Sequence, residues 1–218
     1  MHNIIMLGAQ GSGKGTQAEL LAARLGIPAI STGNLFRAEI EKNTGLGREI
    51  KKYVDSGDLV PPEIVDQAIS ERVNEGDAEH GFVLDGFPRS VEQADALQVI
   101  LQRENRHLTD VVFINISDAE AMRRLSGRRV CSNMKCEAVY HLEFNPPLKR
   151  ANHCDRCGEV LEQREDDTPE KIQHRLDLYH TETAPLINYY REIGLLREIN
   201  GERTITEVEE AIVMALGV

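Results

Sequence analysis

The sequence lacks any apolar run long enough to cross a membrane. No stretch approaches the roughly 18 or more consecutive apolar residues that indicate a membrane-spanning helix. The N-terminal segment MHNIIMLGAQ also lacks the basic start and the small-residue cleavage site of a secretion signal. We therefore expect a soluble, cytoplasmic protein without a membrane partner.

Basic residues are scarce relative to acidic ones. The 25 Lys and Arg stand against 36 Asp and Glu, which gives a formal net charge of -11. Such a surface repels nucleic acid unless its basic residues gather in one place. They gather around Arg123, Arg124, Arg128 and Arg129. This distribution favours a small anionic ligand in a local cationic pocket, and we expect no nucleic-acid partner.

Cysteine is absent outside residues 131–157. The four cysteines form the pattern Cys131-x4-Cys136, then 17 residues, then Cys154-x2-Cys157. In a reducing compartment, two such pairs are typical of a structural zinc site rather than of disulfides. A tetrathiolate site favours Zn²⁺ but can also hold iron or cobalt. The alternative is a set of four free, buried thiols.

The chain alternates short apolar runs with segments of helical composition. Its 218 residues, 41% of them hydrophobic, are enough for one sizeable core that carries small insertions. The alternation predicts an α/β fold, with a parallel sheet flanked by crossover helices. The expected strands are Asn3 to Leu7, Gly81 to Leu84, Val111 to Ile116 and Leu195 to Ile199, and the expected helices are Gln17 to Leu25, Glu92 to Leu101 and Ala119 to Leu125.

Two capping patterns predict the starts of later helices. Thr168-Pro169-Glu170 combines a cap with a proline in the first turn and opens a long segment toward Tyr190. Thr206-x-x-Glu209 predicts the capping box of a final helix.

Two stretches interrupt the strand–helix rhythm, and we interpret both as insertions. Residues 32–60 are helical in composition, with glycine breaks and no expected strand. Residues 127–167 are rich in cysteine, proline and charge, and we expect a compact metal-bound module there. The core then consists of residues 1–31, 61–126 and 168–218.

The segment GAQGSGKGT, from Gly8 to Thr16, has the pattern of a phosphate-binding loop. It lies between an expected strand and an expected helix. Its glycines let backbone N–H groups converge on an anion, and Lys14 can reach the β and γ oxygens. The alternative is a glycine-rich turn without a ligand. Gly15 separates Lys14 from the hydroxyl of Thr16, and a loop of this form resembles those of the nucleoside monophosphate kinases.

Three further segments resemble the adenylate kinase family and extend the likeness over nearly the whole chain. Ser31-Thr32-Gly33-Asn34-Leu35-Phe36-Arg37 looks like the start of an AMP-binding insertion. Leu84-Asp85-Gly86-Phe87-Pro88-Arg89-Ser90 is similar to a family signature. Gly127-Arg128-Arg129-Val130 and Arg164-Glu165-Asp166-Asp167 look like the entry and the exit of a lid.

The resemblance implies a P-loop NTPase-like core, reversible transfer of a phosphoryl group from ATP to AMP, Mg²⁺ as cofactor and a monomeric state. It assigns ATP, or ADP in the reverse reaction, to Gly11, Ser12, Gly13, Lys14, Gly15, Thr16, Arg124, Arg128, Val139, Tyr140 and Arg203. It assigns AMP to Thr32, Arg37, Asp58, Leu59, Val60, Gly86, Phe87, Pro88, Arg89, Gln93, Arg164 and Arg175. Catalysis falls to Lys14, Arg89, Arg128, Arg164 and Arg175.

Elementary chemistry supports these assignments. Phosphoryl transfer needs aligned phosphates, excluded water and neutralised charge rather than a general base. Guanidinium groups suit this task because they bind phosphate oxygens bidentately and stay protonated. Asp85, at the end of an expected strand, is the candidate to hold the water shell of Mg²⁺. His141, His153, His174 and His180 show no arrangement for acid–base catalysis, and we interpret them as structural.

The sequence departs from the family pattern at three positions. Asn34 replaces a more usual acidic residue, whereas Asp58 and Glu165 stand where basic residues occur. If the backbone of residue 58 makes the contact with AMP, the acidic side chain there is harmless.

Two other functions compete with this interpretation. The cysteine module beside Arg128, Arg129, Lys149 and Arg150 could belong to a zinc-ribbon ATPase that binds nucleic acid, although the acidic charge opposes that. A sister kinase could use GTP as donor, or UMP or CMP as acceptor. The Thr32 and Gln93 segments favour AMP.

Overall fold

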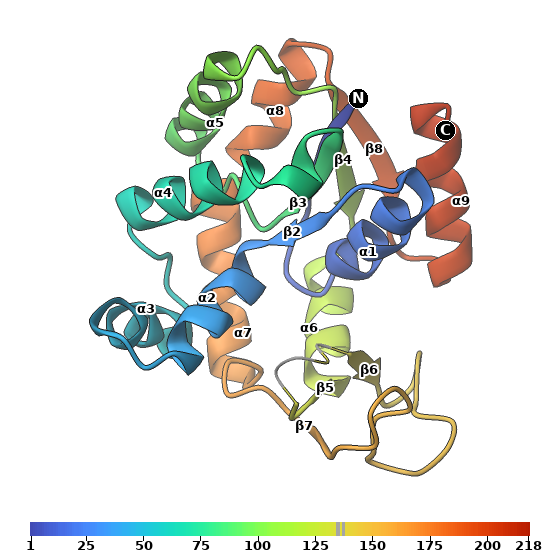
Figure 1. Cartoon of the computed structure of the whole chain (residues 1–218). Coiled ribbons are helices and arrows are strands. Elements are labelled where there is room, and N and C mark those ends of the chain that lie inside the picture. Colours follow the sequence, from blue (N-terminus) through green and yellow to red (C-terminus); the bar gives the residue numbers. More distant parts are fainter. Residues whose placement is uncertain (134–135, 137) are drawn as a thin grey trace.

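A five-stranded parallel sheet forms the centre of the molecule (Figure 1). The structure is a computed structural model that describes residues 1–133, 136 and 138–218. None of the helices in this described part has the length and apolar character of a membrane span. In spatial order the strands are β2 (Ala29–Ser31), β3 (Gly81–Asp85), β1 (His2–Leu7), β4 (Asp110–Asn115) and β8 (Leu196–Asn200).

Helices cover both faces of this sheet. Because side chains alternate along a strand, Ile4 and Met6 of β1 pack on one face, whereas Ile5 and Leu7 pack on the other. Figure 1 shows α1 (Lys14–Leu25) and α9 (Ile205–Leu216) beside the first face. The second face packs against α4 (Pro62–Val73), α5 (Val91–Arg103) and α8 (Pro185–Glu192).

A third, smaller cluster holds two helices below the carboxyl ends of the strands. Leu125 of α6 (Asp118–Gly127) packs with Ile172 and Leu176 of α7 (Pro169–Leu178) and with Ala9 of the glycine loop. In open parallel sheets, ligands bind at this edge of the sheet. The cluster therefore holds α6 and α7 against the expected phosphate site.

The two interrupting stretches have the character that the sequence predicts. Residues 32–60, all of them described, contain α2 (Thr32–Glu41) and α3 (Gly45–Ser56) and no strand. The stretch 127–167 carries an antiparallel sheet of β5 (Arg128–Cys131), β6 (Val139–His141) and β7 (Leu161–Glu162). Figure 1 shows it at the far end of α6 from the central sheet.

The predicted final capping box is wrong by two residues. Thr204 caps α9 and exchanges hydrogen bonds with Glu207, so Thr206 and Glu209 lie inside the helix. The sequence contains two overlapping Thr-x-x-Glu patterns, and pattern alone does not separate them. The buried side chain of Gln17 donates to the carbonyl of Ile205 at 2.8 Å and ties the earlier start to α1.

The segment that opens at Thr168 is interrupted before Tyr190. A π-helical turn, Tyr179–Thr183, separates α7 from α8. Pro185 lacks an N–H and its ring conflicts with the carbonyl four residues earlier, so a regular helix cannot continue through it. The hydroxyl of Thr183 donates to the carbonyl of Arg89 at 2.9 Å, which ties this turn to the signature segment.

Arg106 joins four separate pieces of the core. Its guanidinium donates at 2.9 Å to the carbonyls of Val73 and Ala78 and to the side chain of Asn3. Its central carbon lies 4.9 Å from the centroid of the Phe82 ring. Asn3 and Phe82 are buried, so removal of Arg106 leaves polar groups without partners.

We expect Arg106→Met to lower the free energy of unfolding by about 2 kcal/mol, because hydrogen bonds from a charged donor to buried acceptors disappear. Urea denaturation measures this change. Arg103→Met, on the exposed side of α5, is the control and should change stability by less than about 0.5 kcal/mol. Equal stability of the two variants would contradict the structural role of Arg106.

Candidate active site

The loop between β1 and α1 depends on glycines. Gly8, Gly11 and Gly13 have φ angles of 149°, 82° and 90°, in the region that side chains disfavour. A Cβ at Gly8 would also lie 2.6 Å from the carbonyl oxygen of Ile114. Gly13 precedes the first turn of α1, where unpaired N–H groups and the helix dipole favour an anion. The geometry of the loop therefore fits a bound phosphate, as its sequence pattern predicts.

Gly15 lies close to a side chain at the end of the neighbouring strand. A Cβ at this position would lie 3.1 Å from Oδ2 of Asp85. Met6 of β1 pairs with Asp85 at the end of β3, which brings the carboxylate beside the loop. The Oδ1 atom of Asp85 is buried and has no hydrogen-bond partner among the described residues. An unpaired carboxylate oxygen fits a hydrated Mg²⁺, which retains water and accepts oxygen partners.

Lys14 is held inside the loop. Its Nζ donates to the carbonyl of Ala9 at 3.3 Å. Burial lowers the pKa of Lys14 to about 8; Asp85 opposes this shift, and Arg89 and Arg175 add to it. The amine is thus held at a place where positive charge is unfavourable without a bound anion.

Arg124 connects the glycine loop to two other segments. It donates to the carbonyl of Gly201 at 2.9 Å, to that of Ser12 at 3.4 Å and to Glu120 at 2.7 Å. The exposed ring of Phe144 lies 5.8 Å from its guanidinium carbon. The sequence did not point to Phe144, because neither its exposure nor its contact with Arg124 has a local sequence pattern.

Arg128, Arg164 and Arg175 meet around two adjacent carboxylates. Arg128 binds Asp167 bidentately, at 2.8 and 2.6 Å. Arg164 and Arg175 lie 3.1 and 2.9 Å from Asp166. Burial alone would raise the pKa of Asp166, but Arg164, Arg175 and Arg128 outweigh it and lower that pKa. Burial also lowers the pKa of Arg164 to about 10. Three positively charged guanidiniums therefore share two carboxylates, and a bound phosphate would supply the missing negative charge.

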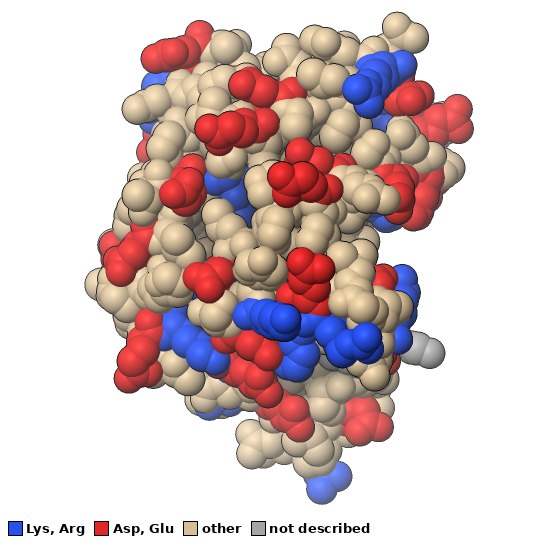
Figure 2. Space-filling model, turned by 90° about the vertical axis from the view of Figure 1, so that its left-hand side faces the viewer, with Lys and Arg blue, Asp and Glu red and all other residues tan. Residues whose placement is uncertain are grey.

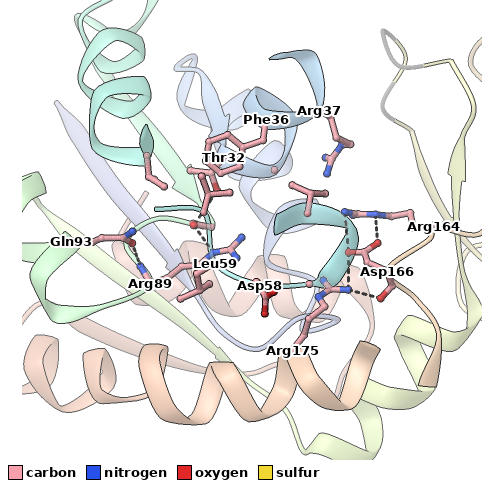
Figure 3. A pocket seen from close by; sticks show the side chains of 16 residues that line it. Thr32, Phe36, Arg37, Asp58, Leu59, Arg89, Gln93, Arg164, Asp166 and Arg175 are labelled. Atoms are coloured by element: carbon pink, nitrogen blue, oxygen red, sulfur yellow. Dashed lines mark hydrogen bonds and ion pairs between the residues drawn. The ribbon is translucent and has the colours of Figure 1, made fainter. Parts of the chain in front are cut away.

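A cavity opens between this cluster and α2 (Figure 3). In Figure 3, Arg164, Asp166 and Arg175 form one end of it, and Arg89 and Gln93 form the other. The residues that the resemblance assigns to AMP line this cavity, with the exception of Phe87 and Pro88. Sequence analysis did not assign Gly33, Phe36, Val54, Gly57, Val65 and Asp166, which also line it.

Hydrogen bonds fix the far end of the cavity. The hydroxyl of Thr32 donates to the carbonyl of Gly86 at 3.0 Å, and the Arg89 Nε donates to the same carbonyl at 2.9 Å. Gln93 accepts from the Arg89 backbone N–H at 2.7 Å. Phe87 lies buried in the core beside the cis peptide that precedes Pro88, so these two residues support the segment from behind.

The unusual Asn34 contacts Arg37 on the wall of the cavity. The Arg37 guanidinium donates to the Asn34 side-chain oxygen. An amide oxygen accepts this hydrogen bond without the charge of a carboxylate. Asn34 therefore orients Arg37 through a neutral acceptor.

The four cysteine sulfurs converge in the module 127–167. The Sγ atoms lie within 4.8 Å of one another, with 3.3 Å between Cys131 and Cys157 and 3.6 Å between Cys136 and Cys154. Zinc–sulfur bonds of about 2.3 Å in a tetrahedron place sulfurs about 3.8 Å apart. The donor set and its size therefore fit a tetrahedral metal ion.

Tyr140 supports this cluster from inside the module. Its buried hydroxyl accepts the backbone N–H of Asp155 at 2.8 Å, which leaves its proton free for the Cys154 sulfur at 3.6 Å. Burial would raise the pKa of Cys154, but backbone N–H groups and the Tyr140 hydroxyl outweigh it and lower that pKa. Its neighbour Val139 is exposed on β6, and Arg203 is exposed in the loop after β8. Neither residue lines the cavity beside α2, and their assignment to ATP stays a prediction.

The fold and the site define the class of protein. A glycine loop joins a parallel strand to a helix, and a partly buried lysine and clustered arginines surround it. These are the features of a P-loop protein that binds phosphates. A sequence model described as adenylate kinase matches residues 6–195. The chain therefore belongs to the adenylate kinase family and is a nucleoside monophosphate kinase, a phosphotransferase.

Full-length relatives agree with this assignment. An adenylate kinase of Desulfitobacterium hafniense is 49% identical over 97% of this chain and 96% of its own length. One of Lachnospira eligens is 47% identical over 98% of this chain and 99% of its own length. One of Geobacillus sp. is 46% identical over 99% and 98%, respectively.

The lowered pKa of Lys14 predicts a pH-dependent affinity for ATP. Bound phosphates favour the ammonium form of Lys14. ATP binding therefore takes up a proton once the pH exceeds the pKa of Lys14 in the free protein, about 8. The Kd for ATP, measured by calorimetry, should be nearly constant below pH 7.5 and rise by up to about tenfold per pH unit above 8. Lys14→Met should lack this rise, and an identical profile in both proteins would contradict the assignment.

Proposed function

We propose that this chain catalyses the reversible transfer of the γ-phosphoryl group of ATP to AMP, which yields two ADP. The observation that carries the proposal is the arginine cluster around Asp166 and Asp167. It lies at the end of a cavity whose walls also carry Arg37 and Arg89. Such a row of partly buried cations suits two nucleotides joined through their phosphates better than it suits one.

In this proposal the residues act by position and charge. The glycine loop and Lys14 hold the donor phosphates, while Arg37 and Arg89 hold the acceptor phosphate. Arg128, Arg164 and Arg175 neutralise charge on the group in transfer, since they already face one another across Asp166 and Asp167. No proton-accepting side chain is required, because a phosphate oxygen of AMP is the nucleophile.

Mg²⁺ accompanies the donor nucleotide in this proposal. Asp85 would hold it through water, since its Oδ1 is buried beside the loop without a partner among the described residues. When bound, the ion neutralises phosphate charge. Gly15 places no side chain beside this carboxylate, since a Cβ there would lie 3.1 Å from Oδ2 of Asp85.

Residues 32–60 and 127–167 would close over the nucleotides as separate bodies around the core of 1–31, 61–126 and 168–218. Water must leave the site, because an exposed phosphoryl donor is hydrolysed. Both stretches carry site residues, Arg37 in one and Arg128 with Arg164 in the other. We further propose that the protein acts as a monomer in the cytoplasm.

The metal in the cysteine cluster is proposed to be structural Zn²⁺. Four thiolates fill a tetrahedral site and leave no position for substrate, so the ion stabilises the small module rather than the reaction. Val139 and Tyr140 would contribute to ATP binding from this module.

An assay over nucleotide pairs tests the proposed reaction. ATP with AMP should give ADP faster than GTP with AMP, or ATP with UMP or CMP. Lys14→Met should lower kcat by roughly 100-fold or more, because the lost charge acts on the transferring group. Faster turnover of another acceptor, or unchanged kcat in the variant, would contradict the proposal.

The metal assignment predicts different effects for two variants. Cys157→Ser should lower metal content below one equivalent and lower the Tm, while leaving the dependence on Mg²⁺ unchanged. Tyr140→Phe should keep all four sulfurs but release zinc to a chelator roughly 10- to 100-fold faster, since it removes a hydrogen bond to a ligand. Tyr53→Phe, in α3, is the control. Equal rates of zinc release from Cys157→Ser, Tyr140→Phe and Tyr53→Phe would contradict the assignment.

A further inference from the structure

Asp58, which lines the cavity, contacts His174 on α7. Oδ1 of Asp58 lies 2.8 Å from Nε2 of His174, and Oδ2 accepts from the Ser56 hydroxyl at 2.6 Å. Hydrogen bonds from Ser56 and His174 lower the pKa of Asp58, so its carboxylate is ionised at neutral pH. The contact joins residues 116 positions apart in the chain.

The two partners come from different elements of the fold, and only Asp58 lines the cavity itself. Asp58 directly follows α3 and the αL residue Gly57, whereas His174 lies on α7 directly before Arg175. Gly57 passes so close to α7 that a Cβ there would lie 3.0 Å from Cγ of Arg175. Figure 3 shows Asp58 between Leu59 and Arg175. The position of the 57–60 backbone relative to the Arg175 guanidinium therefore depends on the contacts that hold this segment against α7.

We propose that the Asp58–His174 pair is a positioning clamp for the AMP side of the reaction. It rests on the proposed function, because it sets the geometry between the 57–60 backbone and a phosphate-binding arginine. The acidic residue at position 58 thus has a role of its own, since its side chain reaches α7 while its backbone lines the cavity.

The expected effect is small because the pair is exposed. Each side chain has 47% of its surface accessible to solvent. Exposed ion pairs contribute about 0.2–1 kcal/mol, which corresponds to roughly a 1.4- to 5-fold change in an equilibrium constant. A clamp of this strength changes substrate affinity without deciding whether the protein folds.

The chain contains a matched control pair. His180 and Asp118 lie 2.9 Å apart, with 52% and 53% of their side-chain surfaces exposed. This second pair joins the π-helical turn to the start of α6, and neither partner lines the cavity. Substitution of His180 therefore removes a histidine–aspartate contact of the same kind from a position outside the cavity.

Steady-state kinetics of His174→Ala, Asp58→Ala and the double variant test the proposal, with the KM values for AMP and ATP measured separately. Each single variant should raise the KM for AMP about two- to fivefold and leave kcat and the KM for ATP within about 1.5-fold. The double variant should be no worse than the worse single variant, because the two side chains act through one contact. His174→Gln, whose amide can donate to Asp58, should restore most of the affinity.

His180→Ala should leave the KM for AMP unchanged. Multiplicative effects in the double variant, an equal rise in the KM for ATP, or a rise in His180→Ala as large as in His174→Ala would each overturn the clamp. Failure of the proposed function gives a different result, since the unmodified protein would then not use AMP at all.

Discussion

Positive charge enclosed within an acidic protein is the constraint on which this site depends. Figure 2 shows acidic side chains over much of one face, with basic side chains gathered in a band across its lower part. Within the site, burial lowers the pKa values of Lys14, Arg89, Arg164 and Arg175. Asp85, Asp166 and Asp167 supply part of the missing counter-charge. The protein is therefore prepared for a ligand that carries several negative charges, and phosphates meet that need.

The fold assembles these charges from distant parts of the chain. Parallel pairing of β1 with β3 and β4 brings the glycine loop and Asp85 to one edge of the sheet. The cluster of Ala9, Leu125 and Leu176 then fixes α6 and α7 beneath that edge, each with an arginine directed at the site. The same strand pairing brings the carbonyl of Ile114 against Gly8 and the side chain of Asp85 close to Gly15, which limits the room for side chains at the loop.

The sequence was sufficient for the parallel sheet, the glycine loop and the cysteine cluster, because each has a local pattern that few other structures produce. It did not predict β2, which is short, or α4, whose start at Pro62 has no side-chain cap. The predicted cap of α9 was wrong because two Thr-x-x-Glu patterns overlap in the sequence. The contact between Gln17 and Ile205 decides between them. The His174 contact and the exposed ring of Phe144 depend on partners far away in the chain, so no local pattern could reveal them.

Calorimetric titration with a bisubstrate analogue, two adenosines joined by five phosphates, tests most directly whether the enclosed cations form one continuous site. One analogue should bind per chain, raise the Tm, and prevent later binding of both AMP and ATP. If the bound analogue left either nucleotide free to bind, or if two analogues bound per chain, the cations would serve separate sites and this interpretation would be wrong.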